Sequence, residues 1–217
     1  MMPSPSASFY RESGNARKII VVDFGFLGDT IHLVPALWEI NRHYPQAEVH
    51  VLTTPVGEGV LQLVTCVKRT WPVELDPHRR TLRQQWHTLC ALRRERFDLA
   101  FNFSGADRTI IWTAMTGARH RVAQAAVREH FWNAWLIPNW APRLPAGMPV
   151  FDQRRQVLAA CGLVLAPPRW DFTLPDAAKR KAESLAPNGA IHLSVSASHP
   201  LKEWPLENWI ALAQRLL

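Results

Sequence analysis

Asp29 lies in the stretch of the sequence whose residue types are best suited to carry chemistry. The stretch Gly25-Phe26-Leu27-Gly28-Asp29-Thr30 follows the apolar run 19–22 and precedes a segment with helical periodicity. It therefore places a turn, the positive end of a helix and one carboxylate at the carboxyl end of a strand, where open α/β sheets bind their ligands. Gly25 and Gly28 would let a ligand approach the backbone closely. Together these features predict an enzyme cleft.

Asp29 also has an interpretation that involves no chemistry. It falls at the cap or in the first turn of the following helix, where a carboxylate accepts backbone N–H bonds and complements the helix dipole. By residue type alone, capping is the commoner of the two roles. The stretch also lacks the middle and third glycines of the dinucleotide-binding fingerprint G-x-G-x-x-G, so the sequence does not predict an ordinary NAD site.

A second stretch gathers small hydroxyl side chains and a lysine near the expected start of a helix. It reads SVSASHPLKEWP from Ser194 to Pro205, follows an apolar run and ends in a proline suited to open a helix. Ser196, Ser198 and Lys202 are thus candidates to hold a phosphate at the positive end of that helix. A solvated polar loop is an equally open interpretation, because the pattern is not the P-loop G-x-x-x-x-G-K-[ST].

The composition indicates a globular chain with an anionic partner. With 217 residues, of which 47% are hydrophobic, the chain can bury a full core. Its formal net charge is +7, and 20 of its 25 basic residues are arginines, whose planar guanidinium suits bidentate phosphate binding. A nucleic acid, a phosphorylated glycan and an acidic membrane surface would all match this charge. No nucleic-acid recognition motif accompanies it, so we expect no nucleic-acid partner.

The cysteines and the amino-terminal residues bear on the location of the protein. Cys66, Cys90 and Cys161 are odd in number and widely spaced, which is typical of reduced thiols in a cytoplasmic protein. No residues have the spacing of a metal site, and no stretch approaches the about 18 apolar residues of a membrane-spanning helix. Residues 1–16 lack a signal-peptide core and are expected to form a disordered leader. We therefore expect a cytoplasmic protein whose arginines can hold it against the anionic inner leaflet as a peripheral protein.

Apolar runs alternate with helical periodicity along most of the chain, which predicts an α/β fold with a parallel sheet. The expected strands cover residues 18–23, 48–53, 68–74, 98–103 and 119–123, and the expected helices cover 30–43, 55–64, 79–94 and 107–116. Four prolines between residues 138 and 149 predict a loop, which a helix over 150–161 follows. A second unit then starts with a helix over 175–185, a strand over 190–195 and a helix from 205. Since one β-α unit cannot bury both of its faces, we expect this unit to be incomplete.

Four separated elements, in this order, resemble glycosyltransferase family 9, the bacterial heptosyltransferases of the lipopolysaccharide inner core. Residues 21–37 are similar to the opening strand, G-D turn and helix of that family. Residues 97–105 resemble its fourth strand and glycine turn, and residues 116–122 resemble the helix-to-strand passage that follows. Lys202-Glu203-Trp204-Pro205 is similar to its K-x-W-P element. The resemblance extends from Lys18 to the last residue.

The resemblance implies a GT-B fold, in which two Rossmann-like domains face each other across a cleft. Residues 17–165 would form the acceptor-side domain, and residues 166–217 the incomplete start of the nucleotide-sugar-binding domain. The implied reaction is the inverting transfer of a heptose, or a related sugar, from a nucleotide sugar to a lipopolysaccharide core acceptor that carries phosphorylated lipid A. ADP-heptose is the expected donor, and no cofactor or metal ion is implied beside this substrate.

The resemblance also implies roles for individual residues. Asp29 matches the general base that takes the proton from the acceptor hydroxyl. Lys202 matches the lysine that binds the donor diphosphate, with Ser196 and Ser198 in the same loop. Acceptor-side candidates, for phosphates and acidic sugars, are Gly28, Gly105, Arg108 and Arg119, and further basic candidates are Arg79, Arg80, Arg83 and Arg121. For each single arginine a solvated helix face is the alternative.

Three positions depart from the pattern of the family. Asp23 stands where the family usually has a basic residue, and its charge could repel that of Asp29 or of the substrate. Val195-Ser196 replaces the usual P-G of the phosphate loop, and Leu201 replaces a hydroxyl residue before the lysine. A second interpretation therefore stays open, in which the chain is a catalytically incomplete Rossmann-like fragment that binds an anionic glycan or a protein partner.

Overall fold

The chain divides into two units, Met1–Thr173 and Leu174–Leu217. A computed structural model describes residues 9–76, 78–79, 81–128, 130–145, 147–186, 189–197 and 200–216. The first unit contains the sheet and every buried residue among those described, whereas the second consists of helices and connecting segments. The first unit therefore holds the core from which a site can be built.

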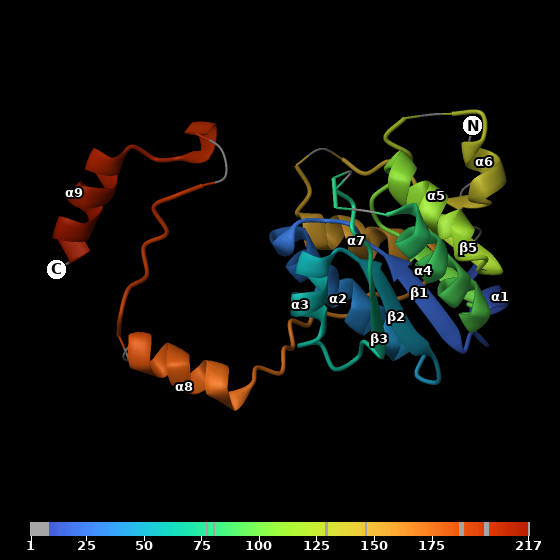
Figure 1. Ribbon diagram of the computed structural model, residues 1–217, viewed down its shortest axis with the longest axis horizontal. Coiled ribbons are helices and arrows are strands. Elements are labelled where there is room, and N and C mark those ends of the chain that lie inside the picture. The colour runs from blue at the N-terminus through green and yellow to red at the C-terminus, as the bar shows by residue number, and fades with distance from the viewer. Residues whose placement is uncertain are drawn as a thin grey trace. The chain divides into compact units, whose positions relative to one another are not determined.

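Six parallel strands form the sheet of the first unit, in the order β3-β2-β1-β4-β5-β6 (Figure 1). They are β1 (Lys18–Val22), β2 (Glu48–Thr53), β3 (Arg69–Pro72), β4 (Leu99–Asn102), β5 (His120–Ala123) and β6 (Asn139–Trp140). The strand order reverses between β1 and β4, and the crevice outside the carboxyl ends of such a pair is where doubly wound sheets bind ligands.

Helices cover both faces of this sheet (Figure 1). The first face carries α1 (Phe9–Ser13), α2 (Leu27–His43), α3 (Pro55–Leu61) and α7 (Val150–Ala160), and the second carries α4 (Leu82–Glu95) and α5 (Asp107–Met115), with α6 (Asn133–Leu136) beside α5. Along β1, Ile19 and Val21 join the core of the first face, and Ile20 and Val22 join that of the second. Because both faces are covered, the strand is a continuous apolar run instead of an alternating one.

Side-chain caps begin two of the helices. The Thr54 hydroxyl accepts the Gly57 N–H at 3.1 Å at the start of α3, where Pro55 occupies the first turn. The Thr81 hydroxyl accepts the Gln84 N–H at 3.2 Å at the start of α4. Each bond satisfies a backbone donor that has no partner within the helix. Helix α4 thus begins at Leu82, three positions after the expected start.

The predicted α/β fold with a parallel sheet is confirmed, and the predicted strands and helices of the first unit are present with small shifts at their ends. The proline-rich loop prediction missed β6, whose Asn139 and Trp140 pair with Val122 and Ala123 of β5. Two residues carry too little periodicity to indicate a strand. Helix α6, of four residues, was missed for the same reason.

The prediction of a disordered leader over residues 1–16 is wrong for its described part. Residues 1–8 lie outside the described residues, but residues 9–13 form α1, and Phe9 is only 2% exposed within the core of the first face. The Tyr10 hydroxyl donates to the His43 carbonyl at 2.9 Å, and the Ser13 hydroxyl lies 2.9 Å from that of Tyr44. The segment is ordered by these contacts with α2 and not by its own helix propensity, which is why its composition was misleading.

The second unit contains α8 (Asp176–Leu185), the short 3₁₀ helix η1 (Pro200–Lys202) and α9 (Leu206–Leu216). The two α-helices were predicted, but the strand expected over 190–195 is absent from the described residues, and Ile191 and Val195 are exposed. A strand is stabilised by hydrogen bonds to a neighbouring strand, and the described part of this unit supplies none. The apolar run alone was therefore an insufficient signal.

The burial of Phe9 generates a prediction about α1. Phe9→Ala should lower the free energy of unfolding by about 3 kcal/mol, because it removes a fully packed aromatic ring and leaves a cavity. Urea denaturation followed by circular dichroism measures this change. Phe131→Ala is the matched control, since that ring is 88% exposed and its loss should change stability by less than about 0.5 kcal/mol. Equal effects of the two substitutions would contradict the packing of α1.

Candidate active site

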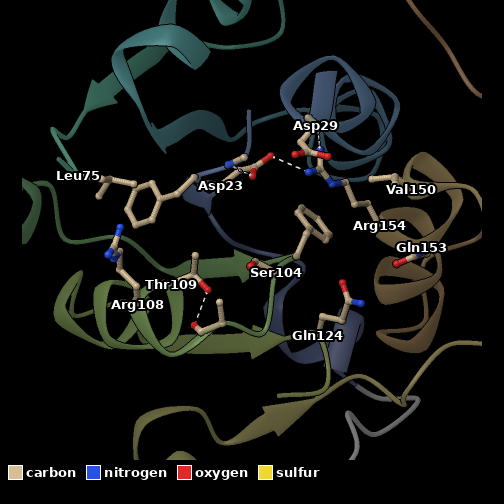
Figure 2. A pocket seen from close by; sticks show the side chains of 14 residues that line it. Asp23, Asp29, Leu75, Ser104, Arg108, Thr109, Gln124, Val150, Gln153 and Arg154 are labelled. Atoms are coloured by element: carbon tan, nitrogen blue, oxygen red, sulfur yellow. Dashed lines mark hydrogen bonds and ion pairs between the residues drawn. The ribbon is translucent and has the colours of Figure 1, made fainter. Parts of the chain in front are cut away.

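A pocket of about 530 Å³ opens at the carboxyl ends of β1 and β4, at the reversal point of the strand order. Figure 2 shows its polar side chains converging from the segments after these strands and from α7. The polar and charged residues among those that line it are Asp23, Asp29, Ser104, Arg108, Thr109, Gln124, Gln153 and Arg154. The predicted cleft is thus present on the first unit.

Asp29 lies in the first turn of α2 with its carboxylate at the pocket. Its Oδ2 accepts the backbone N–H of Phe26 at 3.2 Å, so the side chain closes the turn as a capping residue does. A Cβ atom at Gly25 would lie 2.4 Å from the Cβ of Asp29, closer than real atoms approach, whereas a Cβ at Gly28 would meet nothing within 4 Å. Of the two glycines, only Gly25 is therefore required by the close approach of Asp29.

A buried ion pair between Asp23 and Arg154 forms one wall of the pocket (Figure 2). The Oδ2 of Asp23 lies 3.0 Å from the Nη2 of Arg154, and both side chains are almost fully buried. The Oδ1 of Asp23 accepts the backbone N–H of Gly25 at 2.9 Å, and Nη1 of Arg154 donates to the backbone carbonyl of Asp29. Arg154 thus joins α7 to both the end of β1 and the first turn of α2.

The electrostatics of Asp23 differ from the expectation that it would act as a bare repelling charge. Burial raises the pKa of Asp23, and the nearby charge of Asp29 adds to this rise, whereas Arg154 and the Gly25 N–H oppose it. The guanidinium of Arg154 therefore offsets the charge of Asp23. Apart from this pair, the pocket presents the carboxylate of Asp29 and the cation of Arg108.

The turn after β4 forms the opposite side of the pocket. The Oδ1 of the buried Asn102 accepts the N–H of Ser104 at 2.9 Å and that of Gly105 at 3.4 Å. Gly105 has φ +65°, and a Cβ atom there would lie 2.4 Å from the carbonyl oxygen of Ala125, so glycine is needed at this position. The turn leads into α5, where the exposed Arg108 lines the pocket across from Arg154 (Figure 2).

Two of the predicted basic candidates, Arg119 and Arg121, are not among the described residues that line this pocket. Arg119 precedes β5 at the amino end of the strand, is exposed, and lines a separate cavity beside Arg93. The guanidinium of Arg121 donates to the carbonyls of Leu136 at 2.8 Å and Ala118 at 2.7 Å, so it holds α6 in place. Because Arg119 lies at the amino end of β5, it is at the edge of the parallel sheet opposite to the pocket.

Two of the remaining basic candidates, Arg79 and Arg83, lie away from the pocket. The Nε of Arg79 lies 3.7 Å from the Oδ2 of Asp76, with which it forms an ion pair, and Arg83 lies on the exposed side of α4. Arg80 is outside the described residues. These arginines are therefore not part of the described pocket lining.

The candidate phosphate-binding residues belong to the second unit. Ser196 and Lys202 are both exposed, and Lys202 ends η1 shortly before α9 begins. Ser198 lies outside the described residues. The backbone N–H of Ala197 donates to Glu203 at 3.5 Å, which folds the loop locally.

Arg154 is the main site residue that the sequence interpretation missed, together with Thr109, Gln124 and Gln153. A signal for Arg154 existed, because Asp23 is an acid in a strand end that is expected to be buried, and a buried acid needs a partner. The helix over 150–160 contains two arginines, Arg154 and Arg155, but the sequence alone did not place this helix beside β1. Gln124 and Gln153 carry no such signal.

Two further structural findings concern ligands and membranes. Among the described residues there is no group of three or more histidine, cysteine, aspartate or glutamate side chains that could hold a metal ion. No helix within the described part of the chain has both the length and the apolar character needed to cross a bilayer.

Residues 86–217 match the family model of glycosyltransferase family 9 (heptosyltransferase). The chain belongs to this family. Among curated proteins, it is 21% identical over 203 residues to the lipopolysaccharide core heptosyltransferase OpsX of Haemophilus influenzae, a match that covers 91% of this chain and 56% of OpsX. This member of family 9 thus spans little more than half the length of that relative.

Solved structures of the family share the fold. A family 9 glycosyltransferase from Veillonella parvula superposes with a TM-score of 0.77 at 15% identity, over 92% of this chain and 59% of its own. Heptosyltransferase WaaC of E. coli, solved with ADP-2-deoxy-2-fluoro heptose, superposes with a TM-score of 0.68 at 15% identity. This match covers 92% of the present chain and 65% of the WaaC chain. E. coli heptosyltransferase II superposes with a TM-score of 0.65 at 18% identity, over 92% of the present chain and 61% of its own. The predicted GT-B fold class is thereby confirmed for this chain.

The Asp23–Arg154 pair generates a prediction with a defined pH dependence. Arg154→Met should lower the free energy of unfolding by about 3 kcal/mol at neutral pH, because it leaves a buried carboxylate unpaired. Because the pKa of Asp23 is raised in the folded state, the folded protein holds this proton more tightly than the unfolded chain does. Stability therefore falls as the pH rises from the unfolded-state pKa of Asp23 through its folded-state pKa. Without Arg154 the pKa of Asp23 rises further, so the fall in stability with rising pH continues to a higher pH.

Chemical denaturation of Arg154→Met at several pH values measures this effect. The loss of stability should shrink as the pH is lowered and Asp23 becomes protonated. The double variant Asp23→Asn/Arg154→Met is the matched control, since it has no buried charge and should recover most of the loss at neutral pH. A loss that is independent of pH and is retained in the double variant would contradict the assignment.

Proposed function

We propose that this family 9 protein takes part in the inverting transfer of a heptose, or a related sugar, from a nucleotide sugar to a lipopolysaccharide core acceptor. Family membership and the polar pocket at the carboxyl edge of the first unit support this proposal. The names of its relatives point the same way: OpsX is a lipopolysaccharide core heptosyltransferase, and WaaC was solved both with ADP and with a fluorinated ADP-heptose analogue. ADP-heptose is accordingly the donor that we propose.

The position of Asp29 is the observation that carries the proposal. One carboxylate oxygen is held by the Phe26 N–H, and the other accepts no hydrogen bond from the described residues, so it is available to an acceptor hydroxyl. As the hydroxyl oxygen bonds to the anomeric carbon, Asp29 takes the proton, and the bond from that carbon to the diphosphate breaks on the opposite face. Attack and departure on opposite faces invert the anomeric configuration.

The acceptor and the leaving group need cations. Arg108 on the first turn of α5 lines the same pocket as Asp29 and is suited to a phosphate or acidic sugar of the acceptor, since guanidinium binds such groups in a bidentate manner. On the donor side, Lys202, Ser196 and Ser198 are the proposed ligands of the diphosphate. A fixed lysine stabilises negative charge that grows as the nucleotide leaves, so the proposed reaction uses no metal ion and no cofactor.

Asp29→Asn separates the chemical role of this residue from its capping role. The asparagine side-chain oxygen can still accept the Phe26 N–H, so the free energy of unfolding should change by less than about 1 kcal/mol. Transfer from ADP-heptose to a core acceptor, measured by ADP release, should fall by about a thousandfold or more because the base is lost. Asp29→Ala should lose activity equally and stability in addition. Retained transfer in Asp29→Asn would contradict the role as base.

The donor proposal is tested by calorimetric titration of the 217-residue chain with ADP-heptose and with ADP. Binding should be weakened in Lys202→Ala and unchanged in Lys181→Ala, which removes another exposed lysine from the same unit. The lost ion pair with the diphosphate should weaken binding by at least about tenfold. Absence of binding by the folded chain would instead favour the alternative, a module that binds an anionic glycan or a protein partner without catalysis.

A further inference from the structure

Helix α4 exposes a basic and aromatic face that the proposed transfer reaction does not use. Leu82 is 85% exposed and Trp86 is 68% exposed, and they lie one helical turn apart. Beside them runs a groove of about 790 Å³ whose lining includes Arg83, His87 and Arg94. We define the α4 face as Leu82, Arg83, Trp86, His87 and Arg94.

The groove of the α4 face is lined by basic residues, whereas acidic residues line only the adjoining cavity. No aspartate or glutamate is among the described residues that line its groove. Glu95, the acidic residue of α4, forms ion pairs with other residues: its Oε2 lies 2.6 Å from the Nζ of Lys18, and its Oε1 lies 3.3 Å from the Nη1 of Arg69. The charges of Arg83 and Arg94 are therefore available to an anionic partner.

The residue types of the face indicate which anionic partner it fits. An exposed tryptophan and leucine among arginines is the composition of helices that lie in a membrane interface, where the apolar side chains enter the headgroup region and the cations meet anionic lipids. The buried side of α4, through Leu89 and Leu92, is anchored in the core of the first unit. The helix can therefore present this face without unfolding.

We propose that the α4 face docks the protein on an anionic lipid bilayer. Thr81 and Gln84 at the start of α4 lie in a cavity with Pro72 and Glu74, at the carboxyl end of β3. Leu75, the next residue, lines the Asp29 pocket. Docking through this face would thus place the rim of the pocket close to the lipid surface. The inference concerns lipid binding alone and does not depend on the proposed transfer reaction.

Vesicle sedimentation with the full 217-residue chain tests the proposal. The protein should sediment with vesicles of phosphatidylcholine mixed with phosphatidylglycerol and stay in the supernatant with phosphatidylcholine alone. Arg83→Gln/Arg94→Gln should reduce the partition coefficient by at least about tenfold, because each of the two lost arginines contributes to the attraction between the protein and the anionic lipid surface. Arg180→Gln/Lys181→Gln removes the same charge from exposed positions of α8 and should change it by less than about twofold.

Trp86→Ala separates docking from general attraction of a basic protein to an anionic surface. The net charge is unchanged, yet the partition coefficient should fall by at least about fivefold because apolar contact with the bilayer is lost. Trp135→Ala, which removes an 83% exposed tryptophan from α6, should leave binding unchanged. Equal binding of the Trp86 variant and the original chain would overturn the proposal. So would sedimentation velocity showing a dimer that Trp86→Ala dissociates, since a second copy would then occupy the face.

Discussion

The ion pair between Asp23 and Arg154 is the contact on which the geometry of the candidate site depends. It joins the end of β1 to α7, and the same guanidinium donates to the backbone carbonyl of Asp29 in the first turn of α2. Desolvation of two charges is costly, and the cost is offset only when their remaining hydrogen-bonding groups find partners. Here the Gly25 N–H and the Asp29 carbonyl are those partners, so the stability of the pair and the placement of the first turn of α2 are coupled.

The sequence alone was enough to predict those parts of the molecule whose structure depends on the local pattern of residues. The central strands β1 and β4 are buried on both faces, so they appear as apolar runs that no exposed element would carry. Asp29 was placed correctly in the first turn of α2 because a turn with glycine followed by an acid and a helical pattern has few other interpretations. Because the predicted strands are parallel, their carboxyl ends meet at one edge of the sheet, and this is the edge that carries the pocket. The order of the strands was not predicted.

Features created by contacts between distant segments were beyond the sequence pattern. Helix α1 is held by Tyr10 and Ser13 bonding to residues about 30 positions later, and its serine-rich surroundings resemble those of a disordered leader. Arg154 acts on Asp23 across 131 positions, and only the packing of α7 against α2 brings them together. Conversely, the run 190–195 has the apolar character of a strand but no described strand beside it. In each case the deciding interaction is tertiary, which propensity does not encode.

In the proposed reaction Asp29 is both a capping residue and the general base, and the two roles need not exclude each other. A carboxylate has two oxygens, and the cap occupies Oδ2 through the Phe26 N–H. This bond fixes the side chain in one position, and a fixed position within reach of the acceptor hydroxyl is also what a general base requires. Gly25 removes the Cβ that would collide with Asp29, and Arg154 holds the backbone of the same turn. The local structure that makes Asp29 a good cap therefore also holds its side chain at the pocket. Residue type alone could not separate the two proposed roles, because the same geometry serves both.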